Sequence, residues 1–475
     1  MRWTWNRMNR LMLAGCALCI AAGPAMPAMG AEPPVRATVA GRMVVTPAGA
    51  GEEEAVQLDS GLTASLLKLK PGSSVAVADW PVAPGVRQEI ELTRVEIYAP
   101  GARIVKIENG RMVELPRSRH AFYQGRSVDD PETRLVIAVD PDTRTLEGTA
   151  YTRAGRRDLK PAKSGEYLVS TAEAVLGKSG QEPSWNCDQE QSAVVREPLD
   201  LSGTPAAKAL GTVLEKALTL QTATIAVDTD NELMSLKFSN NSTKATNYIA
   251  NLFANMNVMY ERDLQVRLLQ GFTVLRPSTT ADPWVQTSTG NQLTEFTNYW
   301  SAGCNGTCGS VSRAAAMLLS GKSTSNFSAA GVAWLDQLCS TSHGYSVSQV
   351  FLFAEDTSAN DGPLVGHELG HNFGSPHTHC YSPPIDTCYN GEACYTGATS
   401  CPAAQTINGL TNVTGTVMSY CHLTGCGTTA VFHPRSVTLI APKIAAKTGI
   451  CIFPLGVANS LFNDGFEAGS MTSWH

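Results

Sequence analysis

The sequence predicts an α+β protein in which a β-rich region, residues 31–215, precedes a mixed region of strands and helices, residues 216–455. Three observations support this prediction. Alternating apolar stretches with Asp-Pro and Gly punctuation, such as Thr133–Val139, are typical of strands in the first region. In the second region, alternating segments flank a stretch whose apolar residues recur at helical spacing. Ten of the 13 cysteines also lie there, between Cys304 and Cys451, which indicates a disulfide-bonded part.

Residues 1–30 are expected to form a secretory signal peptide. Arginines precede a twelve-residue apolar run, Leu11–Ala22, and Ala28-Met29-Gly30 places small residues at a cleavage site. The run is too short to span a membrane, and no other run approaches that length. The stretch Leu13–Cys16 also matches a bacterial lipoprotein box, but only five apolar residues would then precede the cut. We therefore expect a bacterial secreted protein rather than a periplasmic protein or a lipoprotein.

Strands and a helix are predicted in alternation at the start of the mixed region. Thr222–Asp230 has the β-branched and apolar residues of an opening strand that ends in an acidic turn. Asn247–Arg262 has the apolar spacing of a helix, and Asp263–Leu269 alternates like a second strand. Two further short strands are predicted at Ala314–Leu319 and Gly331–Trp334.

The segment from His367 to His377 has the spacing of a catalytic zinc site. On a helix, His367 and His371 point from the same face about one turn apart, which suits two nitrogens on one ion. Gly374 tolerates a positive φ, so the chain can turn there and bring His377 to the metal as third ligand. Three protein ligands leave a fourth position for water, and Glu368 is placed to take a proton from it.

The helix that carries this motif is predicted from about Pro363 to Phe373. Asn360-Asp361-Gly362-Pro363 supplies a capping side chain followed by a proline in the first turn, which is a helix-start signal. The alternative interpretation is that these histidines lie on an ordinary helix and bind nothing. The added glycine and third histidine make that alternative rare for a chain of this composition.

The elongated histidine motif resembles that of the metzincin zinc endopeptidases. Gly415–Cys421 lies about forty residues past His377 and is similar to the methionine turn of that family, which makes Met418 the candidate methionine. Tyr420 resembles the tyrosine that astacin- and serralysin-type members swing toward the metal. A phenol there could donate a hydrogen bond to the developing oxyanion. The alternative is that Tyr420 only packs.

The order of strands and helix resembles the reprolysin (adamalysin) branch over roughly residues 219–455. This resemblance implies a mixed twisted sheet with helices above an active-site helix, and an irregular, disulfide-bonded lower subdomain. It also implies that Gly331–Trp334 is an edge strand that pairs with an extended substrate. One departure is that reprolysins usually have aspartate directly after the third histidine, whereas Thr378 and then His379 follow here. His379 could compete as third ligand, but the spacing favours His377.

Reprolysins have an amino-terminal pro-domain, and the resemblance implies the same role for residues 31–215. The stretch from Gln189 to Leu220 is expected to be the joint at which activating cleavage occurs, with basic residues at Arg196, Lys208 and Lys216. Residues 456–475 form a carboxy-terminal tail to which we assign no role.

Removal of Cys16 and Cys19 with the signal peptide would leave eleven cysteines, of which ten can form five disulfides in an oxidising compartment. Their pairing does not follow from the sequence. Cys187 is the odd one, alone in the pro-region. Reprolysin pro-domains often use a cysteine to hold the zinc site inactive, and the resemblance implies this switch for Cys187. Its flanking residues do not match the usual switch motif, and the alternative is a disulfide that leaves another cysteine free.

A net charge of −6 and only 16% charged residues argue against nucleic acid as a partner. The motif and the resemblance predict a secreted zinc endopeptidase, made as a zymogen, in which Glu368 is the general base toward a zinc-bound water. Its substrate would be a protein or peptide, and its oligomeric state is left open. A peptidoglycan-directed metallopeptidase and a catalytically weak, zinc-containing binding module are the alternatives. The resemblance also allows for a calcium ion, although the sequence offers no clear ligand set.

Overall fold

The structure is a computed structural model that describes residues 52–162, 165–172, 220–306, 308, 311–322, 331–350 and 358–456, together with the backbone of three short strands at 35–36, 38–44 and 199–200. The chain from Val35 onward forms one compact unit. The predicted signal peptide, Cys187, most of the cleavage joint and all but the first residue of the predicted tail lie outside the described residues. No helix in the described part of the chain is both long enough and apolar enough to cross a membrane.

The predicted β-rich region folds as a sheet of ten strands in the order β1-β4-β5-β8-β9-β10-β11-β12-β3-β2. Each neighbouring pair is antiparallel except β1 with β4. Helix α1 (Leu62–Lys68) packs on this sheet through Leu62 and Leu66, in a core that includes Trp80. The strand predicted at Thr133–Val139 is confirmed as β9. The strands are β1 (Val35–Arg36), β2 (Thr38–Val44), β3 (Glu53–Leu58), β4 (Ser74–Ala83), β5 (Val86–Val95), β8 (Ala121–Ser127), β9 (Arg134–Val139), β10 (Leu146–Thr152), β11 (Gly155–Pro161) and β12 (Tyr167–Thr171).

Most strands of a second sheet come from residues 216–455, which we call the predicted catalytic region. The order in this sheet, called the catalytic sheet below, is β17-β18-β16-β14-β15-β6-β7, with β22 also paired to β14. Strands β14, β15, β16 and β18 are parallel, whereas β17 is antiparallel to β18 and forms one edge. The strands predicted at Thr222–Asp230, Ala314–Leu319 and Gly331–Trp334 are confirmed as β14, β16 and β17. The bounds are β6 (Ile104–Glu108), β7 (Arg111–Leu115), β14 (Gln221–Thr229), β15 (Val266–Leu275), β16 (Ala315–Ser320), β17 (Gly331–Ala333), β18 (Tyr345–Gln349) and β22 (Ile452–Pro454).

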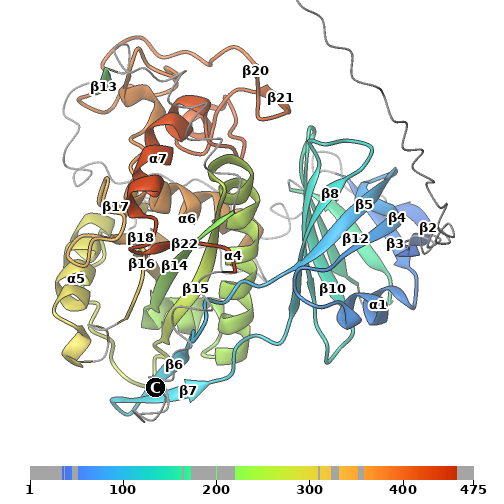
Figure 1. The fold of residues 1–475 in the computed structure, drawn as a ribbon, viewed down its shortest axis with the longest axis horizontal. Helices are drawn as coiled ribbons and strands as arrows, with labels where there is room; N and C mark the ends of the chain where they lie inside the picture. The colour runs from blue at the N-terminus through green and yellow to red at the C-terminus, as the bar shows by residue number, and fades with distance from the viewer. Residues whose placement is uncertain are drawn as a thin grey trace, which may run out of the picture. The chain divides into compact units, whose positions relative to one another are not determined.

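The hairpin β6–β7 comes from the amino-terminal region but belongs to the catalytic sheet (Figure 1). Strand β6 pairs in parallel with β15, with Ile104 opposite Thr273 and Val105 opposite Val274. Both Ile104 and Val105 are fully buried. The amino-terminal region therefore supplies part of the sheet and of the core on which the catalytic region is built.

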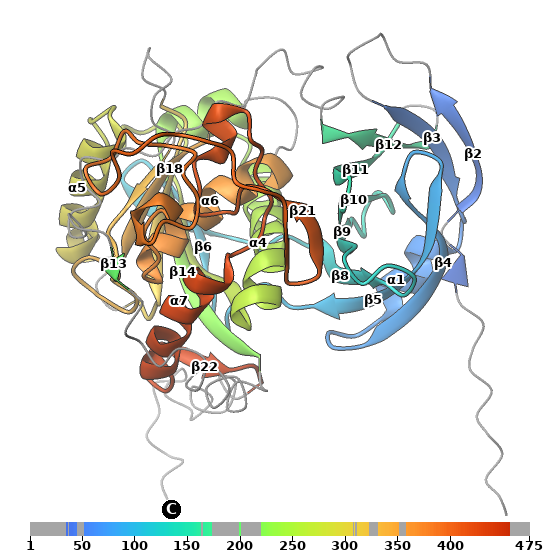
Figure 2. The same ribbon diagram turned by 90° about the horizontal axis from the view of Figure 1, so that it is seen from above.

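Helices cover both faces of the catalytic sheet, as the alternation of buried residues requires. Ile225, Val227 and Met317 pack with helices α4 (Ser242–Leu264) and α6 (Ser358–Asn372). Ala226 and Leu318, which point the other way, pack with helix α5 (Thr289–Ser301). Figure 2 shows α4 and α6 as neighbours on one side and α5 on the other. This arrangement confirms the predicted α+β fold with helices over a mixed sheet.

The remaining elements are short, apart from one helix, and most lie in the region after the third histidine. They are η1 (Leu233–Lys237), η2 (Cys304–Gly306), η3 (Thr378–Cys380), η4 (Cys421–Thr424), α7 (Pro434–Lys447), β13 (Leu199–Asp200), β19 (Tyr381–Ser382), β20 (Gln405–Ile407) and β21 (Leu410–Val413).

Three predicted boundaries are wrong. The helix predicted at Asn247–Arg262 is α4, which begins five residues earlier, at Ser242. The strand predicted at Asp263–Leu269 begins only at Val266, because Leu264 still belongs to α4 and Gln265 ends that helix in the left-handed conformation. The helix predicted from Pro363 begins at Ser358, so Pro363 lies inside it. Instead of capping the helix, Asp361 accepts hydrogen bonds from the Tyr248 hydroxyl at 2.6 Å and the Lys237 ammonium at 3.3 Å.

Candidate metal centre and active site

Three imidazoles converge on one point at the carboxyl end of α6. His367 and His371 lie one turn apart on α6, with their Nε2 atoms 3.0 Å from each other. Gly374 has φ +105°, and the turn there brings His377 Nε2 to 3.0 Å from His371 Nε2 and 3.2 Å from His367 Nε2. A tetrahedral zinc with ligands at 2.0–2.1 Å holds two nitrogens about 3.3–3.4 Å apart. The three side chains therefore fit a single zinc ion.

Main-chain carbonyl groups orient two of these imidazoles. His367 Nδ1 donates to the Val417 carbonyl at 2.6 Å, and His371 Nδ1 donates to the Ser375 carbonyl at 2.7 Å. A carbonyl can only accept, so each bond places the proton on Nδ1 and leaves the Nε2 lone pair for a metal. Burial, followed by the neighbouring imidazoles, lowers the pKa of His371 to about 3 and that of His367 well below its ordinary value. Both rings are thus neutral at neutral pH, as metal ligands must be.

The third imidazole has a side-chain neighbour that the sequence analysis missed. His377 Nδ1 lies 2.6 Å from Glu392 Oε1, and His379 Nε2 lies 3.0 Å from Glu392 Oε2. Burial raises the pKa of the Glu392 carboxyl, but His377 and His379 lower this pKa by more than burial raises it. The pKa of Glu392 therefore lies well below its ordinary value. Only one signal in the sequence could have drawn attention to Glu392: it and Asp386 are the only acidic residues between Cys380 and Cys426.

His379 stays outside the group of three converging imidazoles. Its ring stacks on that of His377, with centroids 5.5 Å apart and planes at 16°, while its Nε2 faces Glu392. Among the described residues, two groups that include His377 lie close enough together to share an ion: the first is His367, His371 and His377, and the second is His377, His379, Cys380 and Glu392. A third group, Asp386, Cys388 and Cys421, has both of its cysteines in one disulfide. Cys380 is bonded to Cys394 and cannot act as a thiolate in the second group.

Glu368 is fully buried on α6 and reaches the edge strand of the sheet. Its carboxylate lies so close to Gly331, the first residue of β17, that a Cβ atom at Gly331 would overlap Oε1. The candidate base, the three imidazoles and the open edge of β17 thus lie together. The sequence placed Gly331 on the edge strand but gave no sign of its contact with Glu368.

Met418, the candidate methionine of the predicted turn, packs against α6. It is fully buried, and a Cβ atom at Gly370 would lie only 2.6 Å from its Sδ. The Met418 carbonyl accepts from Thr378 N at 3.1 Å and from Thr378 Oγ1 at 3.3 Å. Met418 therefore supports the metal-site helix with its side chain and the segment after His377 with its main chain.

Gly370→Ala should destabilise the fold by about 1–3 kcal/mol, because the added methyl group overpacks the contact with Met418. Gly362→Ala is a matched control on the same helix, since its Cβ would meet nothing closer than 3.4 Å. Urea unfolding of both variants measures the difference. Equal stability of the two variants would contradict the close packing of Met418 on α6.

Tyr420 is buried beside the third histidine. Its ring centroid lies 4.3 Å from that of His377 and 5.4 Å from that of His379. Tyr389 meets the Tyr420 ring edge-on at 5.0 Å. Tyr420 therefore packs among the imidazoles, which is consistent with both the predicted role and the packing alternative.

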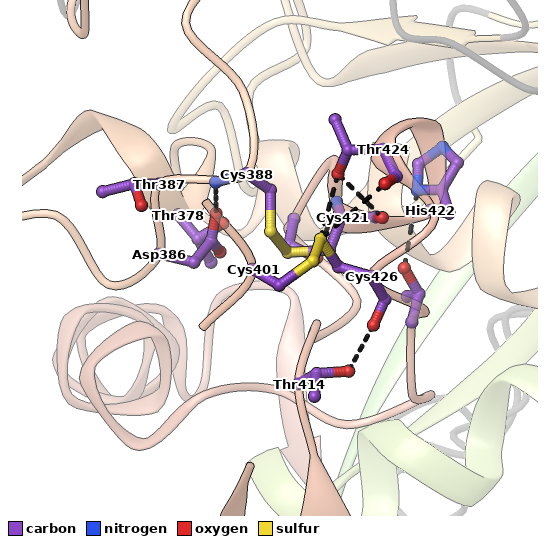
Figure 3. The surroundings of a disulfide bond; sticks show 12 residues. Thr378, Asp386, Thr387, Cys388, Cys401, Thr414, Cys421, His422, Thr424 and Cys426 are labelled. Atoms are coloured by element: carbon purple, nitrogen blue, oxygen red, sulfur yellow. Dashed lines mark hydrogen bonds between the residues drawn. A yellow bond between two sulfur atoms is a disulfide. The ribbon is translucent and has the colours of Figure 1, made fainter. Parts of the chain in front are cut away.

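Five disulfides hold the catalytic region, and they use all ten of its cysteines, as predicted. The pairs are Cys304–Cys308, Cys339–Cys451, Cys380–Cys394, Cys388–Cys421 and Cys401–Cys426. Figure 3 shows Cys388–Cys421 and Cys401–Cys426 close together in the irregular region after His377, where Thr414 Oγ1 donates to the Cys426 carbonyl at 2.5 Å. Disulfides therefore take the place of a larger hydrophobic core in this region.

This geometry fits a zinc-dependent metallopeptidase, and comparison with known proteins gives the family. Residues 219–429 match the reprolysin model described as Metallo-peptidase family M12, so this part of the chain is a reprolysin-like metzincin domain. Among solved structures, the chain is similar to metalloproteinase-II from Bacteroides fragilis, at 10% identity and a TM-score of 0.38, over 71% of this chain and 89% of that one. A search of curated proteins found no match.

Proposed function

We propose that this chain is a secreted zinc endopeptidase, made as a zymogen, whose metal is held by His367, His371 and His377. The convergence of the three Nε2 atoms beside Glu368 and the β17 edge is the observation that carries the proposal. A zinc ion held there would supply Lewis acidity toward a water molecule and the scissile carbonyl group. Calcium forms no part of this proposal.

Glu368 is the proposed general base. Its carboxylate takes one proton from the attacking water and passes it to the nitrogen of the leaving amine. Burial keeps bulk water away from the carboxylate, and its place against Gly331 puts it next to the strand along which a substrate would run. The water oxygen first adds to the carbonyl carbon, whose π electrons move to its oxygen, and the peptide C–N bond then breaks as the carbonyl group re-forms and the amine takes up the proton.

An extended peptide chain is the proposed substrate. Strand β17 pairs with β18 on one side only among the described residues, so its other edge can accept main-chain hydrogen bonds from a peptide. This mode of binding suits unfolded or flexible segments of a protein. Mapping of cleavage sites in a denatured proteome, with and without a zinc chelator, tests it. Cleavage that persists after the zinc has been removed would contradict the proposal, and hydrolysis of purified cell walls but not of casein would favour the peptidoglycan alternative.

Tyr420→Phe tests the proposed action of the phenol on the developing oxyanion. The exchange keeps the ring packed against His377 and removes only the hydroxyl group. If the hydroxyl acts in the transition state, kcat should fall more than KM rises. Steady-state kinetics on a fluorogenic peptide measures both constants, and an unchanged kcat would leave Tyr420 with a packing role alone.

Export and latency complete the proposal. Five disulfides support folding in an oxidising compartment, in line with a signal peptide at residues 1–30. Because these disulfides use ten cysteines, Cys187 is left over once the signal peptide has been removed. A thiolate binds zinc strongly and would block the position needed by water.

Cys187→Ser in the proform should therefore give premature activity and self-cleavage, whereas a thiol-modifying mercurial should activate the wild-type proform. Casein hydrolysis and the appearance of fragments on a denaturing gel report both effects. A Cys187→Ser proform that stays fully latent would rule out the switch.

A further inference from the structure

We propose that Glu392 is the positioning residue for the third zinc ligand, and that the Cys380–Cys394 disulfide holds it in place. This inference rests on the proposed ligand set and adds to it a carboxylate that orients His377. A carboxylate bound to the outer nitrogen of a ligating imidazole fixes its ring and makes it a stronger ligand.

The three imidazoles differ in the group that faces Nδ1, the ring nitrogen that points away from the proposed metal. His367 and His371 point Nδ1 at main-chain carbonyls, which the fold supplies whatever the side chains are. His377 instead points Nδ1 at Glu392 Oε1, 2.6 Å away. His377 also lies beyond the end of α6, so no helix fixes its ring. The His377 ring also packs against Tyr420 and His379, but Glu392 is the polar side chain that its Nδ1 faces.

The Glu392 carboxylate is itself held from both sides. Its second oxygen lies 3.0 Å from His379 Nε2, and the His379 side chain is fully buried whereas that of Glu392 is 10% exposed. A carboxylate can only accept, so its contact with His377 favours a proton on Nδ1 and leaves the Nε2 lone pair free. His379 thus holds the Glu392 carboxylate from the side opposite His377. This buried histidine supports the site through Glu392 and is not itself a metal ligand.

A disulfide joins the segment that carries His377 to the segment that carries Glu392. Cys380 follows His377 by three residues, Cys394 follows Glu392 by two, and the two cysteines are bonded to each other. Between Tyr381–Ser382 and Gln405–Ile407 the chain forms no strand or helix beyond isolated bridges, so regular structure does not place Glu392. Cys388–Cys421 also ties this stretch to the rest of the chain, but Cys380–Cys394 joins it directly to the segment of His377. In this proposal, the Cys380–Cys394 bond therefore sets the distance between the carboxylate and the imidazole.

The same residues do not make a second metal site. Cys380 is consumed by the disulfide, and His377 directs its Nε2 into the three-imidazole group. His379 and Glu392 then remain as two side chains, fewer than the three protein ligands of a catalytic zinc site. Positioning is the role that the geometry favours.

The test compares zinc affinity, by chelator competition, in the full chain and in its Glu392→Ala and Glu392→Gln variants. Zinc affinity of Glu392→Ala should fall by about 10–100-fold, the range typical for loss of an outer partner of a ligand. Glu392→Gln keeps an accepting oxygen and should lie between Glu392→Ala and wild type. In the cobalt-substituted protein, the visible spectrum should shift in Glu392→Ala, because the ligand field changes when His377 is free to turn.

Paired cysteine variants separate positioning from general loss of structure. Replacement of Cys380 and Cys394 by Ser should lower zinc affinity as Glu392→Ala does. The same replacement of Cys401 and Cys426, a disulfide in the same irregular region, should leave zinc affinity within about twofold of wild type.

Zinc affinity and a cobalt spectrum equal to wild type in Glu392→Ala would overturn the inference, and so would a Cys401–Cys426 variant as impaired as the Cys380–Cys394 variant. If Glu392→Ala does not fold, Glu392→Gln decides, because wild-type affinity there would also overturn it. If the wild-type chain binds no zinc that depends on His377, the proposed ligand set itself fails.

Discussion

Glu368→Gln is expected to lower peptide hydrolysis by about 10²–10⁴-fold while about one zinc per chain stays bound. Glutamine matches glutamate in size and keeps a carbonyl oxygen near Gly331, but it cannot take up a proton at neutral pH. Glu368 is not one of the proposed metal ligands, so the exchange leaves the metal site intact. Hydrolysis of casein and the zinc content of the purified protein measure the two parts of the prediction.

Glu114→Gln makes the same exchange at a side chain that is 63% exposed on β7, and it should leave activity unchanged. Casein cleavage by Glu368→Gln at a rate close to that of Glu114→Gln would show that the proposed base is wrong.

His377→Ala is expected to remove zinc and activity together, whereas His379→Ala should keep zinc bound. The first exchange deletes one of the three converging nitrogens, and the second removes only the outer anchor of Glu392. Activity of His377→Ala should fall by more than about 10²-fold, beyond the range typical for loss of an outer partner. Zinc analysis after dialysis and casein hydrolysis check both variants.

The reverse outcome, with zinc lost in His379→Ala and kept in His377→Ala, would assign the third ligand to His379. It would also break the match between this chain and the spacing of its family motif.

The histidine cluster could be predicted from the sequence because its geometry is local. Helical spacing fixes His367 against His371, and a glycine at the turn allows the positive φ of Gly374 that brings in His377. Strands β14, β16 and β17 could be predicted for the same reason. Hydrophobic pattern and β-branched residues report on the conformation of a short segment.

Other parts of the site depend on contacts between distant segments, which a local pattern does not report. Glu392 lies in a stretch rich in turn-forming residues, and the Cys380–Cys394 bond joins this stretch to the segment of His377. The contact of Gly331 with Glu368 likewise joins a strand to a helix through the tertiary fold. The start of α6 does not follow from the local pattern, because Asn360–Pro363 has the residues of a helix start but lies inside the helix, where Asp361 binds Tyr248 and Lys237.

The place of β6 in the catalytic sheet changes what a cut in the joint between residues 189 and 220 would produce. Withdrawal of β6 would leave β15 paired with β14 alone and would expose Ile104 and Val105, which are fully buried. Burial of two such side chains alone is worth about 3–6 kcal/mol. After such a cut, the amino-terminal fragment would therefore stay bound to the carboxy-terminal fragment. The two fragments would associate without a covalent link, as two subunits do. Cleavage would break the covalent chain, but the sheet that contains β6 and β15 would stay intact.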